Sequence, residues 1–122
     1  MIKRMFSAIQ AHDLDALLLV CDPDIAIRSL IAEAEGGTFR GHDGVRSWWA
    51  AVIEMLDVRP GAESFEEFRG RGITRMALAG RIGDVQVPQT MWMAWKVRNG
   101  KVVWWRTCRT EADALEAAGL SE

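Results

Sequence analysis

The sequence contains no tyrosine, and among its 122 residues it has only three prolines, two cysteines and two histidines. The cysteines, Cys21 and Cys108, match no metal-binding spacing, so we expect reduced thiols in a cytoplasmic protein. The histidines, His12 and His42, stand at two separate expected helix starts, and a zinc site needs three or four ligands. The sequence therefore predicts no metal and no other cofactor.

An excess of one charge and long apolar runs are also missing. Lys and Arg together number 15 against 17 Asp and Glu, and a net charge of −2 argues against nucleic acid as the main partner. No apolar run approaches the roughly 20 residues that span a bilayer, and the N-terminus does not resemble a secretory signal. The chain is predicted to form one globular domain, residues 1–122, in the cytoplasm.

Tryptophan and methionine are abundant instead, with six of each. Four tryptophans lie within residues 85–110, namely Trp92, Trp95, Trp104 and Trp105. In this stretch Asn99-Gly100 separates two β-rich runs, and both residues tolerate the positive φ angles of a type I′ turn. Residues 85–110 are therefore predicted to form a long β-hairpin, one face of which the rest of the chain covers.

Apolar spacing and capping residues predict the other elements. Residues 2–20 favour a helix with a break near His12, after which Asp13 would cap a second short helix at 14–21. There follow a strand at 25–30, a loop at 32–41, a helix at 44–56 capped by Asp43 and ended by Arg59-Pro60-Gly61, strands at 63–69, 73–82, 85–97 and 101–110, and a helix at 111–118 with Gly119 as C-cap. This order indicates an α+β fold, a curled antiparallel sheet with helices on one face.

Four segments carry a family resemblance: FSAIQAHDLDAL at 6–17, DPDI at 22–25, GTFRGHDGVRSWW at 37–49 and RNGKVVWWR at 98–106. In this order and spacing they resemble SnoaL-like proteins of the nuclear transport factor 2-like superfamily, relatives of ketosteroid isomerase, limonene-epoxide hydrolase and polyketide cyclases. The resemblance implies a cone-shaped fold, a curved antiparallel sheet wrapped around N-terminal helices, with a pocket at one end. It specifies no activity, because this fold hosts many.

An alignment with ketosteroid isomerase, together with strand alternation, implies which residues face the pocket. They are Met5, Phe6 and Trp49 on the helices, Ile25, Ile27 and Ser29 on the first strand, Thr74, Met76, Leu78 and Gly80 on the middle strand, and Gln89, Met91, Met93, Trp95, Val103, Trp105, Thr107 and Arg109 on the hairpin. The opposite parity turns Trp92, Trp104 and Arg106 outward. Since members of the superfamily commonly pair through that sheet face, the resemblance implies a homodimer with these three residues at its interface.

The catalytic residues of the relatives have no counterpart here. The general base of the isomerase falls at Ser29, and its two oxyanion-hole residues fall at Met5 and Met93. The acid on the last strand of the epoxide hydrolase falls at Thr107. None of these side chains is a carboxylic acid, and the two methionines have no proton to donate.

Five polar residues are left as candidates for catalysis: Glu33, Glu35, Glu66, Thr107 and Arg109. Arg109 would anchor a carboxylate or an enolate at the pocket mouth, or else pair with a nearby glutamate or lie exposed at the strand end. Glu33 and Glu35 belong to a glycine-flanked loop, where carboxylates are usually solvated. Glu66 could face inward, although a bulge or an edge strand is the simpler explanation of its surroundings.

Two functions stay open. The first is a domain whose Met- and Trp-lined pocket binds a small hydrophobic ligand of polyketide or terpenoid type, with isomerase, cyclase or hydrolase activity from a non-standard acid–base set. The second is a non-catalytic homodimerisation or accessory module whose cone is filled by its own side chains. A cavity of roughly 300 Å³ or more would favour the first function, and a filled interior would favour the second.

Overall fold

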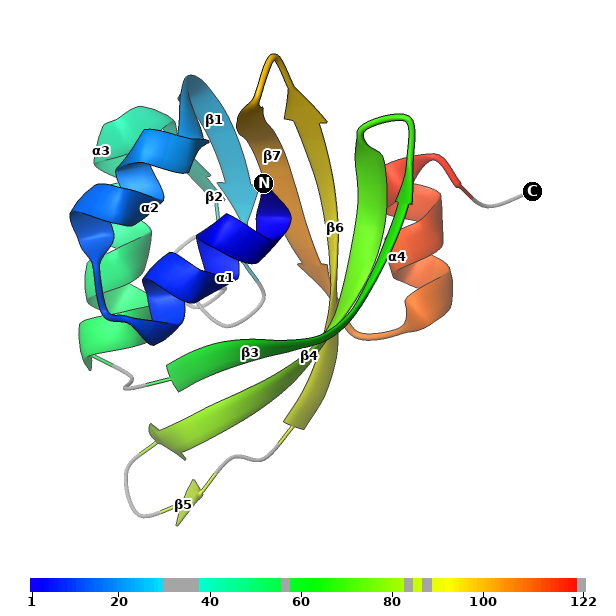
Figure 1. Ribbon diagram of the computed structural model, residues 1–122. Helices are drawn as coiled ribbons and strands as arrows, with labels where there is room; N and C mark the ends of the chain where they lie inside the picture. The colour runs from blue at the N-terminus through cyan, green and yellow to red at the C-terminus, as the bar shows by residue number, and fades with distance from the viewer. Residues whose placement is uncertain (30–37, 56–57, 83–84, 87–88, 121–122) are drawn as a thin grey trace.

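The computed structural model describes residues 1–29, 38–55, 58–82, 85–86 and 89–120. Its elements are α1 (Ile2–Gln10), α2 (Leu14–Val20), β1 (Cys21–Arg28), β2 (Thr38–Arg40), α3 (Gly41–Trp48), the π-helix η2 (Trp49–Met55), β3 (Val58–Phe68), β4 (Arg71–Ile82), β5 (Val85–Gln86), β6 (Gln89–Arg98), β7 (Lys101–Cys108) and α4 (Glu111–Ala118) (Figure 1). The predicted α+β class is confirmed. No helix among the described residues is long and apolar enough to cross a membrane.

The strands form one curved sheet in the order β2-β1-β7-β6-β4-β3, and the short β5 pairs with β4. β1 and β7 run parallel, whereas the other described pairs are antiparallel. The expectation of a purely antiparallel sheet is therefore corrected. A parallel pair needs a long crossover, and here the whole chain from β2 to β6 connects the two strands.

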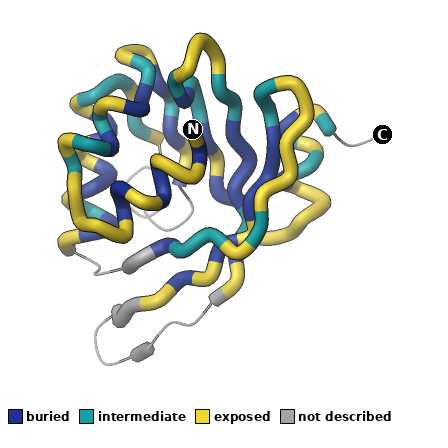
Figure 2. The backbone as a smooth tube through the Cα atoms, in the orientation of Figure 1, coloured by how far each residue is buried: buried dark blue, intermediate teal, exposed yellow. Residues whose placement is uncertain are grey.

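The helices lie on both faces of the sheet, not on one as predicted. α1, α2 and α3 cover one face, called here the inner face, and α4 packs against β4, β6 and β7 on the other, called the outer face (Figure 1). Buried residues of the helices and of the inner face together form the main core. Figure 2 shows the buried stretches of the backbone in dark blue. A smaller cluster lies under α4: Ile73, Ala94, Cys108, Ala114 and Ala118.

The N-terminal helices match the sequence prediction closely. α1 ends at Gln10, and His12, with φ 56°, sits in the turn before α2. Asp13 caps α2, because its side chain accepts a hydrogen bond of 3.0 Å from the Ala16 backbone N–H. β1 begins at Cys21, before the predicted start at residue 25, and its pairing with β7 shifts register between Cys21 and Ala26.

The third helix differs from its prediction in three ways. It begins at Gly41 after the N-cap Arg40, so Asp43 lies in its first turn and pairs with Arg46 at 2.9 Å instead of capping. After Trp48 the chain continues as the π-helix η2. The residues around Pro60 were expected to end the helix but belong to the edge strand β3. The Pro60 carbonyl accepts a hydrogen bond of 2.6 Å from the Gln10 side chain.

The predicted hairpin is formed by β6 and β7. Its turn residues Asn99 and Gly100 have φ angles of 53° and 73°, as a type I′ turn requires. The register shifts after Lys96, so Val102 is fully buried and Val103 is only half-buried. The predicted inward position of Val103 is corrected, because this β-bulge moves it out of the alternation.

Candidate functional site

A small cavity, called here the inner cavity, lies between the helices and the inner face of the sheet. It is lined by Met5, Phe6 and Ile9 of α1, Ser29 after β1, Trp48 of α3, Pro60 of β3, Met76 of β4, Met93 of β6, and Trp105 and Thr107 of β7. Its volume is about 10 Å³, which is about the room that one water molecule needs. In the described part of the chain, the interior is thus almost filled by its own side chains.

Two residues that line this cavity each carry a buried polar atom with no hydrogen-bond partner among the described residues. The two atoms are the hydroxyl oxygen of Ser29 and the indole nitrogen of Trp48, and these residues are only 1% and 3% exposed. A buried polar group without a partner costs about 1–3 kcal/mol. The serine hydroxyl can donate a hydrogen bond and the indole N–H can only donate. Each of the two groups can therefore donate a hydrogen bond to an acceptor atom.

Packing fixes the orientation of the Trp48 indole. Its ring stands edge-to-face against Trp105, with centroids 5.2 Å apart and an interplanar angle of 78°. Trp48 is also the last residue of α3 before η2, and π-helical turns occur frequently at functional sites. The next residue, Trp49, begins η2, and its ring lies 5.3 Å from that of His12.

A second buried indole shows how this fold satisfies polar atoms elsewhere. The Trp95 indole N–H donates a hydrogen bond of 3.0 Å to the hydroxyl oxygen of Thr74, which is fully buried. The Trp95 ring lies directly over Gly72, where an added Cβ would come within 2.6 Å of the ring. The Trp95 indole N–H therefore has a hydrogen-bond partner, whereas the Trp48 indole N–H and the Ser29 hydroxyl have none among the described residues.

The predicted pocket residues divide into two groups. Met5, Phe6, Ser29, Met76, Met93, Trp105 and Thr107 line the inner cavity. Ile25, Ile27, Trp49, Thr74, Leu78, Met91 and Trp95 are buried in the structure without reaching the cavity. The side chains of Gly80 and Gln89 lie outside the described set.

The candidates for catalysis do not gather at the inner cavity. Glu33 and Glu35 lie outside the described residues, and Glu66 is exposed on the edge strand β3. Arg109 follows the end of β7 and is exposed, so strand alternation no longer turns it inward as predicted. Thr107 does line the cavity, and its hydroxyl donates to the Arg28 carbonyl at 3.5 Å.

The described lining of the cavity offers no acid–base or metal chemistry, because it contains no carboxylate, imidazole, thiol, amine or guanidinium. No group of three or more His, Cys, Asp or Glu among the described residues is placed to hold a metal ion. His42 instead contacts the Cys21 carbonyl oxygen, 3.0 Å from its Nε2.

Sequence reasoning did not select Trp48, Ile9 and Pro60 as lining residues. Ile9 and Trp48 each belong to the apolar stripe of a predicted helix. That stripe could have marked them as inward, although it could not separate core residues from cavity residues. The sequence predicts Pro60 within the stretch that ends the helix, where no strand parity applies.

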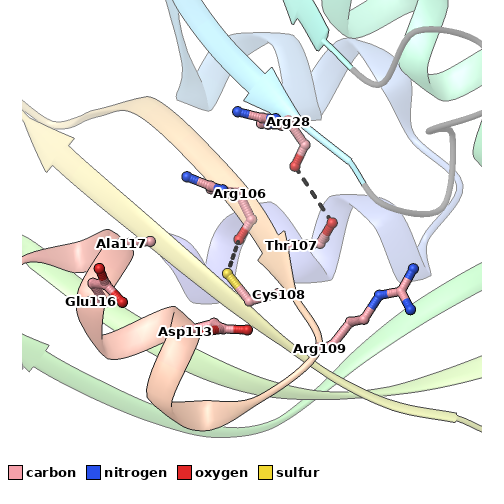
Figure 3. A pocket seen from close by; sticks show the side chains of 8 residues that line it. All are labelled: Arg28, Arg106, Thr107, Cys108, Arg109, Asp113, Glu116 and Ala117. Carbon is pink, nitrogen blue, oxygen red and sulfur yellow. Dashed lines mark hydrogen bonds between the residues drawn. The ribbon is translucent and has the colours of Figure 1, made fainter.

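On the outer face, α4 and the strands enclose a wide crevice of about 570 Å³, called here the outer crevice (Figure 3). It is lined by Arg28, Arg106, Thr107, Cys108, Arg109, Asp113, Glu116 and Ala117. The predicted interface residue Arg106 therefore borders this crevice. Trp92 and Trp104, the other two, are half-buried against the cluster under α4.

Both thiols are buried. Burial raises the pKa of Cys21 from 9.0 to about 12, with a smaller opposing effect of Lys101. Burial also raises the pKa of Cys108, which Arg106 lowers and Asp113 raises to smaller extents. The pKa of Cys108 thus responds to charged residues on both sides of the outer crevice, Arg106 and Asp113.

Comparison with known proteins connects this architecture to a family. The family model described as SnoaL-like domain matches residues 2–105. No curated protein matches the sequence of this chain. The cone fold implied by the sequence resemblance is nevertheless confirmed by solved structures.

Three of these structures illustrate the likeness. TerC, crystallised with polyporic acid, is 19% identical and has a TM-score of 0.78, with 98% of this chain and 95% of that chain covered. A candidate polyketide cyclase of Sinorhizobium meliloti is 19% identical with a TM-score of 0.74, over 87% and 91% of the two chains. A Catenulispora acidiphila protein of ketosteroid isomerase-like fold, in complex with trimethylamine, is 17% identical with a TM-score of 0.70, over 98% and 92%. At these identities the likeness concerns the fold alone.

Proposed function

Because this chain belongs to the SnoaL-like domain family, whose model covers residues 2–105, we propose that it binds a small, largely apolar molecule carrying a carbonyl oxygen. The carbonyl oxygen accepts hydrogen bonds from the Ser29 hydroxyl and the Trp48 indole N–H. One observation carries the proposal: among the described residues, two that line the same cavity each carry a buried polar atom without a partner.

The chemistry of the two donors selects the ligand. A carbonyl oxygen has two lone pairs and can accept both hydrogen bonds at once, whereas a hydrocarbon of the same shape leaves both donors unpaired. Sites built to hydrogen-bond a polar group reject analogues that lack it. Apart from Thr107, whose hydroxyl donates to the Arg28 carbonyl, the rest of the described lining is apolar. The remainder of the ligand is therefore largely apolar, as in a polyketide or terpenoid ketone.

The size of the cavity requires that side chains move when the ligand binds. The cavity has a volume of about 10 Å³, which is far below the roughly 300–1,000 Å³ of ligand pockets. By this criterion alone the filled interior favours the accessory-module alternative, and a ligand has to open the cavity. Three of its lining side chains are methionines: Met5, Met76 and Met93. Methionine is unbranched and has three rotatable bonds, so it repacks at low cost. The ligand therefore displaces methionine side chains, and it is small.

Two proteins of similar fold are described together with a small organic molecule. TerC was crystallised with polyporic acid. A computationally designed binder of 17-OHP has a TM-score of 0.73 to this chain at 14% identity. These ligands belong to those proteins, and they support the proposal only through the likeness of the folds. Binding without proton transfer is proposed because the described lining contains no acid or base.

A pair of matched compounds tests the proposal. 1-Tetralone is a compact bicyclic ketone, and tetralin is the same skeleton without the oxygen. In isothermal titration calorimetry we expect 1-tetralone to bind about tenfold more tightly than tetralin, which corresponds to one net hydrogen bond or more. Ser29→Ala and Trp48→Phe should each weaken 1-tetralone binding and leave tetralin binding unchanged.

The outcome against the proposal is equally clear. If neither compound binds, or if both bind equally to all three proteins, the unpartnered donors do not select a ligand. Trp95→Phe is the matched control variant, since it also removes a buried indole N–H but lies off the cavity. It should not change the preference for the ketone.

A second candidate function is homodimerisation through the outer face. It is favoured by the half-exposed state of Trp92 and Trp104, which lie beside α4 without being fully covered by it. Sedimentation velocity tests it: the wild-type protein should sediment as a dimer and Trp104→Arg as a monomer. A wild-type monomer, or a variant that remains dimeric, would exclude this interface.

A further inference from the structure

The outer crevice brings opposite charges to two facing walls. Arg28 and Arg106 extend side by side from β1 and β7, and Asp113 and Glu116 lie on α4 (Figure 3). The volume of about 570 Å³ is within the range of roughly 300–1,000 Å³ that is usual for small-molecule sites. A ligand of modest size therefore fits between the strands and the helix.

The basic wall concentrates two positive charges. Arg28 and Arg106 are direct neighbours in the parallel β1–β7 pairing, and both are exposed. Like charges placed opposite each other on adjacent strands destabilise a sheet. An anion between the two guanidinium groups would remove this repulsion, and guanidinium binds carboxylate and phosphate oxygens in pairs.

The acidic wall is equally exposed. Asp113 and Glu116 are three positions apart on α4, so they project from the same side of the helix. Among the described residues, no ion pair joins either carboxylate to Arg28 or Arg106. Elsewhere on the surface opposite charges do pair, at 2.9 Å for Arg46 with Asp43 and at 3.5 Å in a second case on the β3–β4 pair.

We propose that the outer crevice binds a small zwitterion. Its anionic head, a phosphate or a carboxylate, lies between Arg28 and Arg106, and its ammonium group lies at Asp113 and Glu116. A simple anion gains only the first contact and is repelled by the carboxylates, whereas a simple amine gains only the second. The crevice therefore discriminates by requiring both charges at the separation of the two walls.

Calorimetric titrations at low ionic strength test each wall separately. O-Phosphoethanolamine is the zwitterionic probe, inorganic phosphate supplies the anion alone, and ethanolamine supplies the amine alone. We expect the zwitterion to bind about tenfold more tightly than either fragment, since each wall adds a charge-assisted hydrogen bond. β-Alanine, which carries a carboxylate in place of the phosphate, then shows which anionic head the basic wall prefers.

Substitutions assign the contacts. Arg28→Gln and Arg106→Gln should each weaken O-phosphoethanolamine binding about tenfold or more. The double variant Asp113→Asn, Glu116→Gln should bind O-phosphoethanolamine only as tightly as the wild type binds inorganic phosphate. Arg46→Gln is the matched control, because that exposed arginine pairs with Asp43 far from the crevice, and it should leave binding unchanged.

The Cys108 thiol gives an independent readout, because it borders the crevice while Cys21 does not. Bound O-phosphoethanolamine should slow the alkylation of Cys108 by iodoacetamide and leave Cys21 unaffected. The proposal is overturned if the zwitterion binds no better than phosphate, or if the arginine variants bind as the wild type does. It is also overturned if Arg28→Gln or Arg106→Gln changes only the sedimentation coefficient, since a second copy would then occupy the crevice.

Discussion

The inner and outer faces of the sheet are built from the same strands but from different kinds of residue. Facing the N-terminal helices are large apolar side chains that almost fill the interior and leave about 10 Å³. Facing α4 are Ile73, Ala94 and Cys108, with Trp92 and Trp104 packed beside them. Exposed arginines border a crevice of about 570 Å³ on this face.

The two faces would also select partners by different physics. On the inner face the unpaired polar groups are neutral donors in an apolar surrounding, where a single hydrogen bond is decisive. On the outer face the polar groups are charged and exposed, so their interactions weaken with salt. Strand alternation thus gives one small domain two chemically different surfaces.

The largest loss of stability is expected from a substitution on the inner face, at Gly72. An added Cβ there would meet the Glu66 carbonyl oxygen at 2.1 Å and the Trp95 ring at 2.6 Å. Gly72→Ala should therefore lower the free energy of unfolding in urea by about 3 kcal/mol or more. Gly61→Ala is the control, because its nearest neighbour lies at 3.6 Å. A small loss for Gly72→Ala would mean that the Trp95 ring is not held in this position.

A smaller loss of stability, confined to α4, is expected from a substitution on the outer face, at Ala94. This residue is fully buried under α4, so Ala94→Leu should displace the helix at a cost of about 2 kcal/mol. Hydrogen exchange should become faster in residues 111–118 and stay slow in the inner core. Ala77→Leu, at an exposed position on β4, should change neither. Equal loss of protection throughout would show that the two faces unfold together and are not independent.

Two hydroxyl deletions on the inner face should change stability in opposite directions. Thr74→Val removes the acceptor of the Trp95 indole N–H and should cost about 1–2 kcal/mol, because it leaves a buried donor unpaired. Ser29→Ala removes a hydroxyl that has no partner in the described structure and should be neutral or stabilising by about 1 kcal/mol. Thermal denaturation of both variants checks this, and a destabilising Ser29→Ala would contradict the assignment of Ser29 as unpaired.

The last effect is absent at neutral pH and appears only in alkaline solution. The pKa of Cys21 is raised by burial from 9.0 to about 12, so between these values the unfolded chain loses a proton that the folded chain keeps. This contribution to stability is complete below pH 9 and is lost as the pH rises, with a slope of up to about 1.4 kcal/mol per pH unit. Cys21→Ala should flatten the alkaline decline in urea titrations, and an unchanged slope would mean that Cys21 is accessible to solvent.

Much of the fold could be predicted from local sequence. The Asp13 cap, the Asn99-Gly100 turn and the Gly119 C-cap were found because each depends on the chemistry of one or two neighbouring residues. The position of α4 on the outer face could not be predicted, because it depends on small residues such as Ala94 in distant strands. The same is true of the parallel pairing of β1 with β7, which is a tertiary contact.

The site was less predictable than the fold. Parity selected Ser29, Met76 and Met93, which do line the inner cavity. It failed for Val103, because a β-bulge shifts the register, and for Arg109, because β7 has already ended. The unpartnered state of Trp48 depends on which atoms surround its indole in three dimensions, and no sequence pattern records that.

In the proposed complex, Ser29 and Trp48 hold the carbonyl oxygen of the ligand inside the cone. Infrared spectroscopy of bound 1-tetralone, labelled with ¹³C at the carbonyl, tests this contact most directly, because hydrogen bonds lower the carbonyl stretching frequency. We expect the carbonyl stretching frequency of the bound ketone to lie below its value in an apolar solvent. In Ser29→Ala and in Trp48→Phe this frequency should return part of the way to the apolar-solvent value. A bound carbonyl at the apolar-solvent frequency, or one unaffected by either substitution, would contradict the proposal.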